Sequence, residues 1–264
     1  MYNIKLLNIV PKEVNFLFKY WFVNDEDLSN IINEYPFIQG LRFEFKYKTT
    51  RSEQKYKDVE DELEPWLIQL RMRLRELRFS IVNIIYYYNM DLDDRTKCEL
   101  GIKNGRYFPK LSEQERYYHF YLNYFYGNFQ IQYMTILDAI YHVLNIYYDL
   151  EVKSSIAFHK NIVKRIKNKN FTLGKELDEF FKKCEISKYR NDKIHNYDPN
   201  IPDIAYTNTK KGKKVQSSNS PYICPRYMHA KEKFKILNKE CLKLEDFLKV
   251  VKRHMKQDKN KHLQ

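Results

Sequence analysis

Long apolar runs are missing from this chain of 264 residues. No stretch reaches the roughly 18 apolar residues that a membrane-spanning helix needs. The first residues, Met1 to Lys5, also lack the charged-then-apolar layout of a secretory signal. We therefore expect a cytoplasmic protein that makes no contact with a membrane.

Cysteine and glycine are also scarce. The four cysteines lie far apart and form no C-x-x-C pair, which argues against a disulfide framework or a zinc site. The aspartates at 91–94 lack the ligand spacing of an EF-hand loop. We expect no metal and no cofactor. With only six glycines, the abundant Leu, Ile, Lys and Glu favour a mainly α fold over a turn-rich β architecture.

Charge is plentiful and unevenly distributed. Residues 1–150 carry 19 Lys and Arg against 21 Asp and Glu, whereas residues 151–264 carry 28 against 13. The formal net charge of +13 therefore comes from the second part of the chain. This asymmetry indicates a polyanionic partner, with nucleic acid ahead of a membrane surface. The alternative is that an AT-biased genome enriches lysine without any functional reason.

Residues 1–62 read as a small α+β extension at the N-terminus. Residues 3–10 and 41–48 have the patterns of short strands, and the second alternates apolar and polar residues with period two. Asp25 or Asp27 can cap a helix through Ile32. Residues 49–62 are polar enough for a linker or an exposed helix start.

Residues 63–264 read as a helical domain. Apolar residues recur at three- and four-residue steps from Pro65 to Tyr88, and Ser112 with Glu115 forms a capping box for a helix towards Tyr148. Further helices are expected at 156–166, from Thr172 onwards, and from 234 to 251. Between the last two lies an irregular, basic loop at 198–230, a length that is usually functional or disordered.

Two sets of polar residues on these helices are candidates for a functional site. Arg71, Arg75 and Arg78 flank an apolar seam and could form a phosphate-binding ridge, but such arginines more often pair with carboxylates. Asp138, His142 and Asn145 share one helix face. We expect these three to satisfy one another and nearby tyrosines rather than to form a site.

A compact set of reactive groups follows Ser187. Arg190 and Asn191 are followed by His195, near the end of a predicted short helix before Pro199. Histidine transfers protons near neutral pH, and arginine offers forked donors to phosphate oxygens. Asn191 and His195 are four residues apart, so the amide can orient the ring. The alternative reading is ordinary hydrogen bonding at a helix end.

This pattern resembles the signature of the HEPN superfamily, in which an Arg and a polar residue are followed by a His four to six residues later. Tyr197 also fits the Arg-x4-His-x-Tyr variant of HEPN toxins that pair with nucleotidyltransferase antitoxins. The resemblance implies a HEPN-like bundle of four or five helices. It further implies a metal-independent endoribonuclease that is active as a homodimer and leaves 2′,3′-cyclic phosphate ends.

The same resemblance suggests roles for individual residues. Arg190, Asn191 and His195 would be catalytic, and Tyr197 would be a site of regulatory modification if an antitoxin partner exists. RNA would be held electrostatically by nearby lysines, namely Lys188, Lys193, Lys210, Lys211, Lys213 and Lys214. The biological setting would be toxin–antitoxin, abortive-infection or other antiviral defence, with an antitoxin or another defence protein as partner. The alternatives are a catalytically silent HEPN scaffold that binds RNA or a protein, and a purely structural helical protein.

Overall fold

The computed structural model describes residues 25–45, 54–90, 111–187 and 228–262, and these ranges are helical with no strand. The mainly α prediction is therefore confirmed. The described ranges contain these helices: α2 (Asp25–Glu34), α3 (Phe37–Gly40), α4 (Gln54–Tyr88), α6 (Glu113–Tyr147), α7 (Phe158–Lys169), α8 (Phe171–Lys183) and α10 (Ala230–His262).

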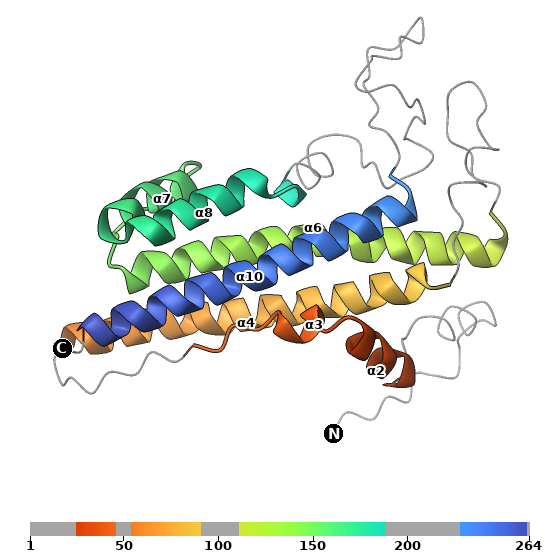
Figure 1. The fold of residues 1–264 in the computed structure, drawn as a ribbon, viewed down its shortest axis with the longest axis horizontal. Coiled ribbons are helices and arrows are strands. Elements are labelled where there is room, and N and C mark those ends of the chain that lie inside the picture. Colours follow the sequence, from red (N-terminus) through yellow and green to blue (C-terminus); the bar gives the residue numbers. More distant parts are fainter. Residues whose placement is uncertain (1–24, 46–53, 91–110, 188–227, 263–264) are drawn as a thin grey trace, which may run out of the picture.

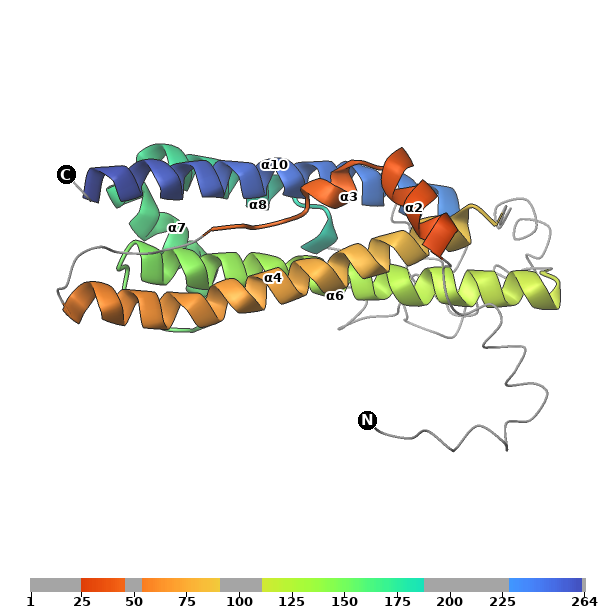
Figure 2. The same cartoon turned by 90° about the horizontal axis from the view of Figure 1, so that it is seen from below.

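Three long helices run lengthwise beside one another and form the body of the molecule (Figure 1). Ring contacts join Trp66 to His142 and Phe79 to Phe125, so α4 and α6 are antiparallel. The hydroxyl of Tyr133 donates to the Glu240 carbonyl, and α10 runs parallel to α6. Figure 2 shows α4 and α6 in one layer and α10 with α2 and α3 in the other.

The capping box predicted for α6 is present. The backbone N–H of Glu115 donates to Ser112 Oγ at 3.3 Å, and the Ser112 N–H donates back to Glu115 Oε2 at 2.8 Å. These bonds satisfy donors that the first helical turn would otherwise leave unpaired. The core behind this helix is rich in tyrosine. Tyr126 and Tyr133 are fully buried, and their hydroxyls bond to Met228 Sδ and to the Glu240 carbonyl.

Helix α4 begins at Gln54, well before the start expected at Pro65. Residues 54–62 thus form a helix start, the second of the two readings of this polar stretch, and Lys57, Asp58, Asp61 and Glu62 are exposed. Proline within a helix removes one backbone donor, and here it lies on the exposed side of α4. The domain boundary expected between residues 62 and 63 falls inside this helix. The residue at which the helical domain begins stays a prediction.

The strand expected at residues 41–48 is wrong for its described part. Residues 41–45 are extended but pair with no strand in the described ranges. The alternation itself is correct, because Leu41, Phe43 and Phe45 are buried while Arg42 and Glu44 are exposed. Period-two alternation reports one-sided burial, and here the apolar side packs onto the helices. Residues 3–10, the other expected strand, lie outside the described ranges.

The short helices α7 and α8 form a hairpin at one end of the bundle (Figure 1). Asn170 caps α8 by accepting the Leu173 N–H at 3.0 Å, and its Nδ2 lies 2.9 Å from Asp258 Oδ2 on α10. His254 Nε2 lies 3.0 Å from Glu176 Oε2. These bonds fix the start of α8 against the last turns of α10.

Gly174 allows α7 and α8 to approach closely. A Cβ at this position would lie 2.7 Å from the backbone nitrogen of Lys167 and 2.8 Å from its Cα. We expect Gly174→Ala to lower the free energy of unfolding by about 1–3 kcal/mol, because the helices must separate. Urea unfolding of the full chain measures this.

Gly40 supplies the matched control. A Cβ there meets only the flexible Glu245 side chain, with its Oε1 at 2.2 Å. That side chain can move, so Gly40→Ala should change stability by less than about 0.5 kcal/mol. Equal losses for the two alanine variants would contradict the role given to Gly174.

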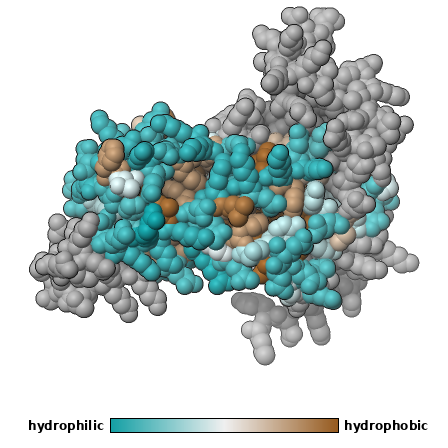
Figure 3. All heavy atoms as spheres, in the orientation of Figure 1, coloured by the Kyte–Doolittle hydropathy of each residue, from teal (hydrophilic) through white to brown (hydrophobic). Residues whose placement is uncertain are grey.

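One face of the molecule is largely hydrophilic where its residues are described. On the face seen in Figure 1, Figure 3 shows mostly hydrophilic side chains with smaller hydrophobic patches between them. Among the helices in the described ranges, none combines the length and the apolar character that crossing a membrane requires.

Candidate functional site

The motif predicted from the sequence lies between two described ends of chain. Arg190, Asn191, His195 and Tyr197 fall within residues 188–227, outside the described residues. The predicted RNA-binding lysines lie in the same interval: Lys188, Lys193, Lys210, Lys211, Lys213 and Lys214. The roles of these residues stay predictions, and the structure describes the two ends of chain between which this segment lies.

The first anchor is the end of α8. This helix stops at Lys183, seven residues before Arg190. Ile186 is fully buried, and Ser187 Oγ donates to the Cys184 carbonyl at 3.2 Å. The backbone is helical again at Ile186 and Ser187, immediately before the motif.

Two lysines of α10 hold this anchor in place. Lys239 forms an ion pair with Glu185, and Lys243 Nζ donates to the Lys183 carbonyl at 2.9 Å. Lys243 also lies 2.5 Å from Glu240 Oε1, whose side chain is fully buried. The described chain that precedes the motif-bearing segment is therefore attached to the first half of α10.

The second anchor is the start of α10. Met228 is buried, with its Sδ 3.8 Å from the Tyr126 hydroxyl on α6. Ala230, where α10 begins, and Lys239 are nine residues apart, which corresponds to about 14 Å along the helix at 1.5 Å per residue. The two described ends of chain that flank the segment therefore lie beside the first half of α10.

A buried polar cluster lies beneath the second anchor. Lys233 of α10 is fully buried and its Nζ donates to Asn123 Oδ1 on α6. Asn123 Nδ2 lies 3.1 Å from Nδ1 of His119, whose side chain is buried as well. One amide thus connects a lysine to a histidine, and in this arrangement the ring Nδ1 accepts the hydrogen bond.

Burial determines the protonation state of this histidine. Burial, followed by the positive charges of Lys233 and His229, lowers the pKa of His119 to about 3. His119 is therefore neutral at physiological pH, in agreement with its role as acceptor for Asn123. The cluster carries positive charge through Lys233, close to the point where the motif-bearing segment rejoins the bundle.

This cluster was not predicted from the sequence, although a signal for it exists. His119 and Asn123 are four residues apart in the predicted helix. Lys233 interrupts the apolar seam that runs through Ala230, Leu237 and Leu244. A lysine at a seam position needs a polar partner in the core, and this indicates a buried polar contact without naming the partner.

Gln130 is another buried polar group on this part of α6. Its side chain is fully buried, and neither amide atom has a hydrogen-bond partner. In the sequence it lies between Tyr126 and Tyr133. Their hydroxyls contact Met228, just before α10, and the Glu240 carbonyl on α10. An unpaired buried amide costs about 1–3 kcal/mol, so the core beneath the segment is not packed for stability alone.

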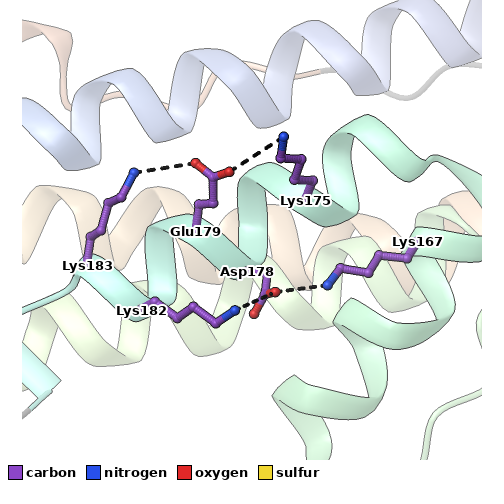
Figure 4. A network of polar contacts seen from close by, with 6 residues as sticks. All are labelled: Lys167, Lys175, Asp178, Glu179, Lys182 and Lys183. Carbon is purple, nitrogen blue, oxygen red and sulfur yellow. Dashed lines mark hydrogen bonds and ion pairs between the residues drawn. The ribbon is translucent and has the colours of Figure 1, made fainter.

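The hairpin that precedes the motif carries a cationic surface. Residues 158–183 contain eight Lys and Arg against three Asp and Glu. Asp178 is shared by Lys167 at 2.9 Å and Lys182 at 3.0 Å, and Glu179 is shared by two further lysines, Lys175 and Lys183 (Figure 4). Hydrogen bonds from Lys167 and Lys182 lower the pKa of Asp178. Each carboxylate thus neutralises only one of its two lysines.

Other cations on this hairpin have no such neighbour. Lys160 and Lys164 are exposed on α7, and no described carboxylate lies within ion-pair distance of either. Surface lysines of this kind attract polyanions through the field that they create together. The basic character predicted for the second part of the chain is therefore presented at the surface of α7.

The polar set predicted on α6 is structural, as expected, but by other contacts. Asp138 Oδ1 lies 2.7 Å from His159 Nε2, His142 stacks on Trp66 at 3.9 Å, and Asn145 bonds both backbone groups of Val152. The expectation that Asp138, His142 and Asn145 bond one another is wrong, because their partners lie on α7, on α4 and on the chain leading into α7.

One of the three arginines singled out on α4 pairs with a carboxylate, as expected. Arg71 Nη2 lies 2.6 Å from Glu64 Oε1, so it is paired. Arg75 is exposed and pairs with no carboxylate among the described residues, and Arg78 is partly buried. Burial, then the charges of Arg42 and Arg75, lower the pKa of Arg78.

Across residues 25–45, 54–90, 111–187 and 228–262, no group of three His, Cys, Asp or Glu is placed to hold a metal ion.

Comparison with known proteins supports the family suggested by the motif. The family model HEPN_Cthe2314-like HEPN matches residues 66–256. No curated protein and no solved structure matches the chain. The matched range includes α6, α7, α8 and most of α4 and α10, together with the segment that contains Arg190 and His195. The chain, with its all-helical bundle, therefore belongs to the HEPN superfamily.

Proposed function

We propose that this protein is a metal-independent HEPN-type endoribonuclease that acts in toxin–antitoxin, abortive-infection or antiphage defence. One observation carries the proposal: Arg190, Asn191 and His195 fall inside the range that matches a HEPN family. The same range contains the cationic hairpin of α7 and α8 and the buried lysine beside the second anchor.

The chemistry needs two proton transfers. A base removes the proton of the ribose 2′-hydroxyl, and the 2′-oxygen attacks the adjacent phosphorus. The bond to the 5′-oxygen then breaks as an acid protonates this leaving group, which yields a 2′,3′-cyclic phosphate and a 5′-hydroxyl. His195 transfers protons, Arg190 stabilises the charge on the crowded phosphate, and Asn191 orients the imidazole ring.

One chain offers one motif histidine, whereas the reaction uses a base and an acid. A homodimer with two-fold symmetry supplies His195 twice and so provides both roles. RNA is held by the lysines around the motif, Lys188 and Lys193 together with Lys210, Lys211, Lys213 and Lys214. Tyr197 is then the site at which a nucleotidyltransferase antitoxin would modify and silence the enzyme.

Cleavage of RNA in the presence of EDTA tests the proposal. The purified full-length chain should cut single-stranded RNA with excess EDTA and leave 2′,3′-cyclic phosphate ends. These ends are detected because a 3′-phosphatase removes their phosphate only after acid has opened the cyclic ring. Salt-sensitive RNA binding with no new ends would instead identify a silent HEPN scaffold. The absence of both binding and cleavage at physiological salt would overturn the RNA-directed function altogether.

We expect the α7 lysines to contribute to RNA affinity. Replacing both Lys160 and Lys164 by alanine should weaken binding and reduce the slope of log K against log salt by up to about 1.4, at roughly 0.7 per phosphate contact on single strands. Fluorescence anisotropy over a salt series measures this. Lys249→Ala is the matched control, since Lys249 is already paired with Glu245 at 2.7 Å. Equal slopes for all three proteins would exclude α7 from the RNA-binding surface.

A further inference from the structure

The outer face of α4 carries a stripe with a defined order of charges. Asp61, Ile68, Met72 and Arg75 are exposed along it, and Ile68 and Met72 retain 49% and 47% of their accessible surface. The stripe begins with an acidic residue, continues with apolar ones and ends with a basic one. It lies on the helix that forms the lower edge of the bundle in Figure 1.

The spacing places these residues in one line. Asp61, Pro65, Ile68, Met72 and Arg75 recur at steps of three and four, as the a and d positions of a heptad do. The opposite side of α4 already has its own seam, which is buried in the core: Leu63, Leu67, Leu70, Leu74, Leu77 and Ile81. Helix α4 therefore has two seams, and the core uses only one of them.

Charges beside the stripe follow the same order. Residues 58–64 contain only acidic charged residues, whereas residues 71–78 contain four arginines and one glutamate. A polyanion such as RNA would be attracted to one half of this face and repelled by the other. The order of charges instead fits a partner that presents the same stripe in the opposite direction.

We propose that the outer face of α4 is a self-association surface that binds the α4 of a second copy in antiparallel orientation. With the two-fold axis at Ile68, Ile68 meets its own copy and Pro65 lies against Met72 of the second protomer. Asp61 and Arg75 are each seven residues from Ile68, or about 10 Å along the helix. Asp61 of each chain therefore meets Arg75 of the other, and the contact forms twice, as an isologous interface requires.

This inference rests on the exposed residues of α4 and not on ribonuclease activity. The proposed catalytic dimer joins the motif-bearing segments, which are anchored on α10, and is a separate contact. Chains that used both contacts would form a closed tetramer where the two two-fold axes cross at right angles, and longer assemblies otherwise. Loss of the α4 contact returns such assemblies to the catalytic dimer, and it returns a dimer held by α4 alone to the monomer.

Two charge-reversed proteins test the pairing. Asp61→Lys makes the stripe basic at both ends, and Arg75→Glu makes it acidic at both ends. Each protein alone should self-associate at least about tenfold more weakly than the wild type, because the two attractions between Asp61 and Arg75 become repulsions. Mixed in equal amounts, the two should recover association, since a basic stripe then faces an acidic one. Sedimentation equilibrium measures the masses.

Matched controls separate this from a general effect of charge. Lys160→Glu with Lys164→Glu on α7 should leave the mass of the wild type unchanged. Circular dichroism melting checks that the α4 variants fold, which is expected because every altered side chain is exposed or half-exposed. Wild-type mass retained by both α4 variants, or failure of the mixture to associate, would overturn the proposal. So would a wild-type chain that stays monomeric across the concentration series.

Discussion

Replacing His195 by alanine should lower the rate of RNA cleavage by about 10²- to 10⁴-fold, the usual contribution of general acid–base catalysis. Arg190→Ala should cost about 10²- to 10³-fold through the lost stabilisation of the transition-state charge. Binding of uncleaved RNA should weaken much less than the rate, because the lysines proposed to hold RNA, among them Lys188, Lys193 and Lys210, are unchanged in both variants. Single-turnover cleavage and anisotropy separate the two effects.

His159→Ala is the matched control for a lost histidine. His159 is partly exposed on α7, and its pair with Asp138 at 2.7 Å holds together two elements of the bundle rather than a reacting group. This variant should keep wild-type cleavage. Activity that survives in both Arg190→Ala and His195→Ala would show that the motif is not catalytic.

Mixed dimers test the need for two histidines. When wild type and His195→Ala are mixed equally and allowed to exchange, about one quarter of the dimers contain two histidines. If both histidines are required, activity should follow the square of the wild-type fraction. A linear dependence would mean that one His195 serves as both base and acid, or that a water molecule takes one of the roles.

The sequence predicted the helices best where contacts between residues close in the chain determine where a helix begins. The start of α6 follows from the reciprocal bonds of Ser112 and Glu115, which depend on residues three apart. The apolar steps from Pro65 to Tyr88 likewise predicted the core-facing side of α4. They could not predict the first turns of that helix, because residues 54–62 are polar and leave no apolar period to count.

Patterns of burial were less informative about pairing. The alternation at residues 41–45 correctly marks Leu41, Phe43 and Phe45 as buried, yet a helix surface rather than a sheet covers them. The partners of Asp138 and Asn145 lie on segments that follow in the chain, at His159 and Val152. One helix wheel shows which residues share a face and not what lies opposite.

The candidate site also combines a part that local sequence predicts with a part that depends on residues far apart in the chain. Arg190 and His195 could be proposed from spacing alone, because their chemistry is local and the HEPN pattern is short. The polar cluster of His119, Asn123 and Lys233 joins residues 110 apart in the chain, and it depends on α6 and α10 running in parallel. No local pattern specifies that arrangement, so only the structure shows a positive charge buried beside the anchor of the motif-bearing segment.

This buried cluster should make the protein sensitive to acid. The folded protein holds the pKa of His119 at about 3, whereas the unfolded chain returns it to about 6.5. The unfolded state therefore binds the proton more tightly, and stability is lost as the pH falls below about 6.5. Between that value and pH 3, His119 should remove up to about 1.4 kcal/mol of unfolding free energy per pH unit.

Urea unfolding at several pH values measures this slope, and His119→Gln isolates the contribution of the ring. Glutamine keeps an acceptor for Asn123 Nδ2, which now lies 3.1 Å from the ring nitrogen, but it does not titrate. Its curve should be flatter by about one proton in this pH range. Identical slopes for the two proteins would mean that His119 is already protonated in the fold. The pair of Asn123 and Lys233 would then have to accommodate a second positive charge in the core.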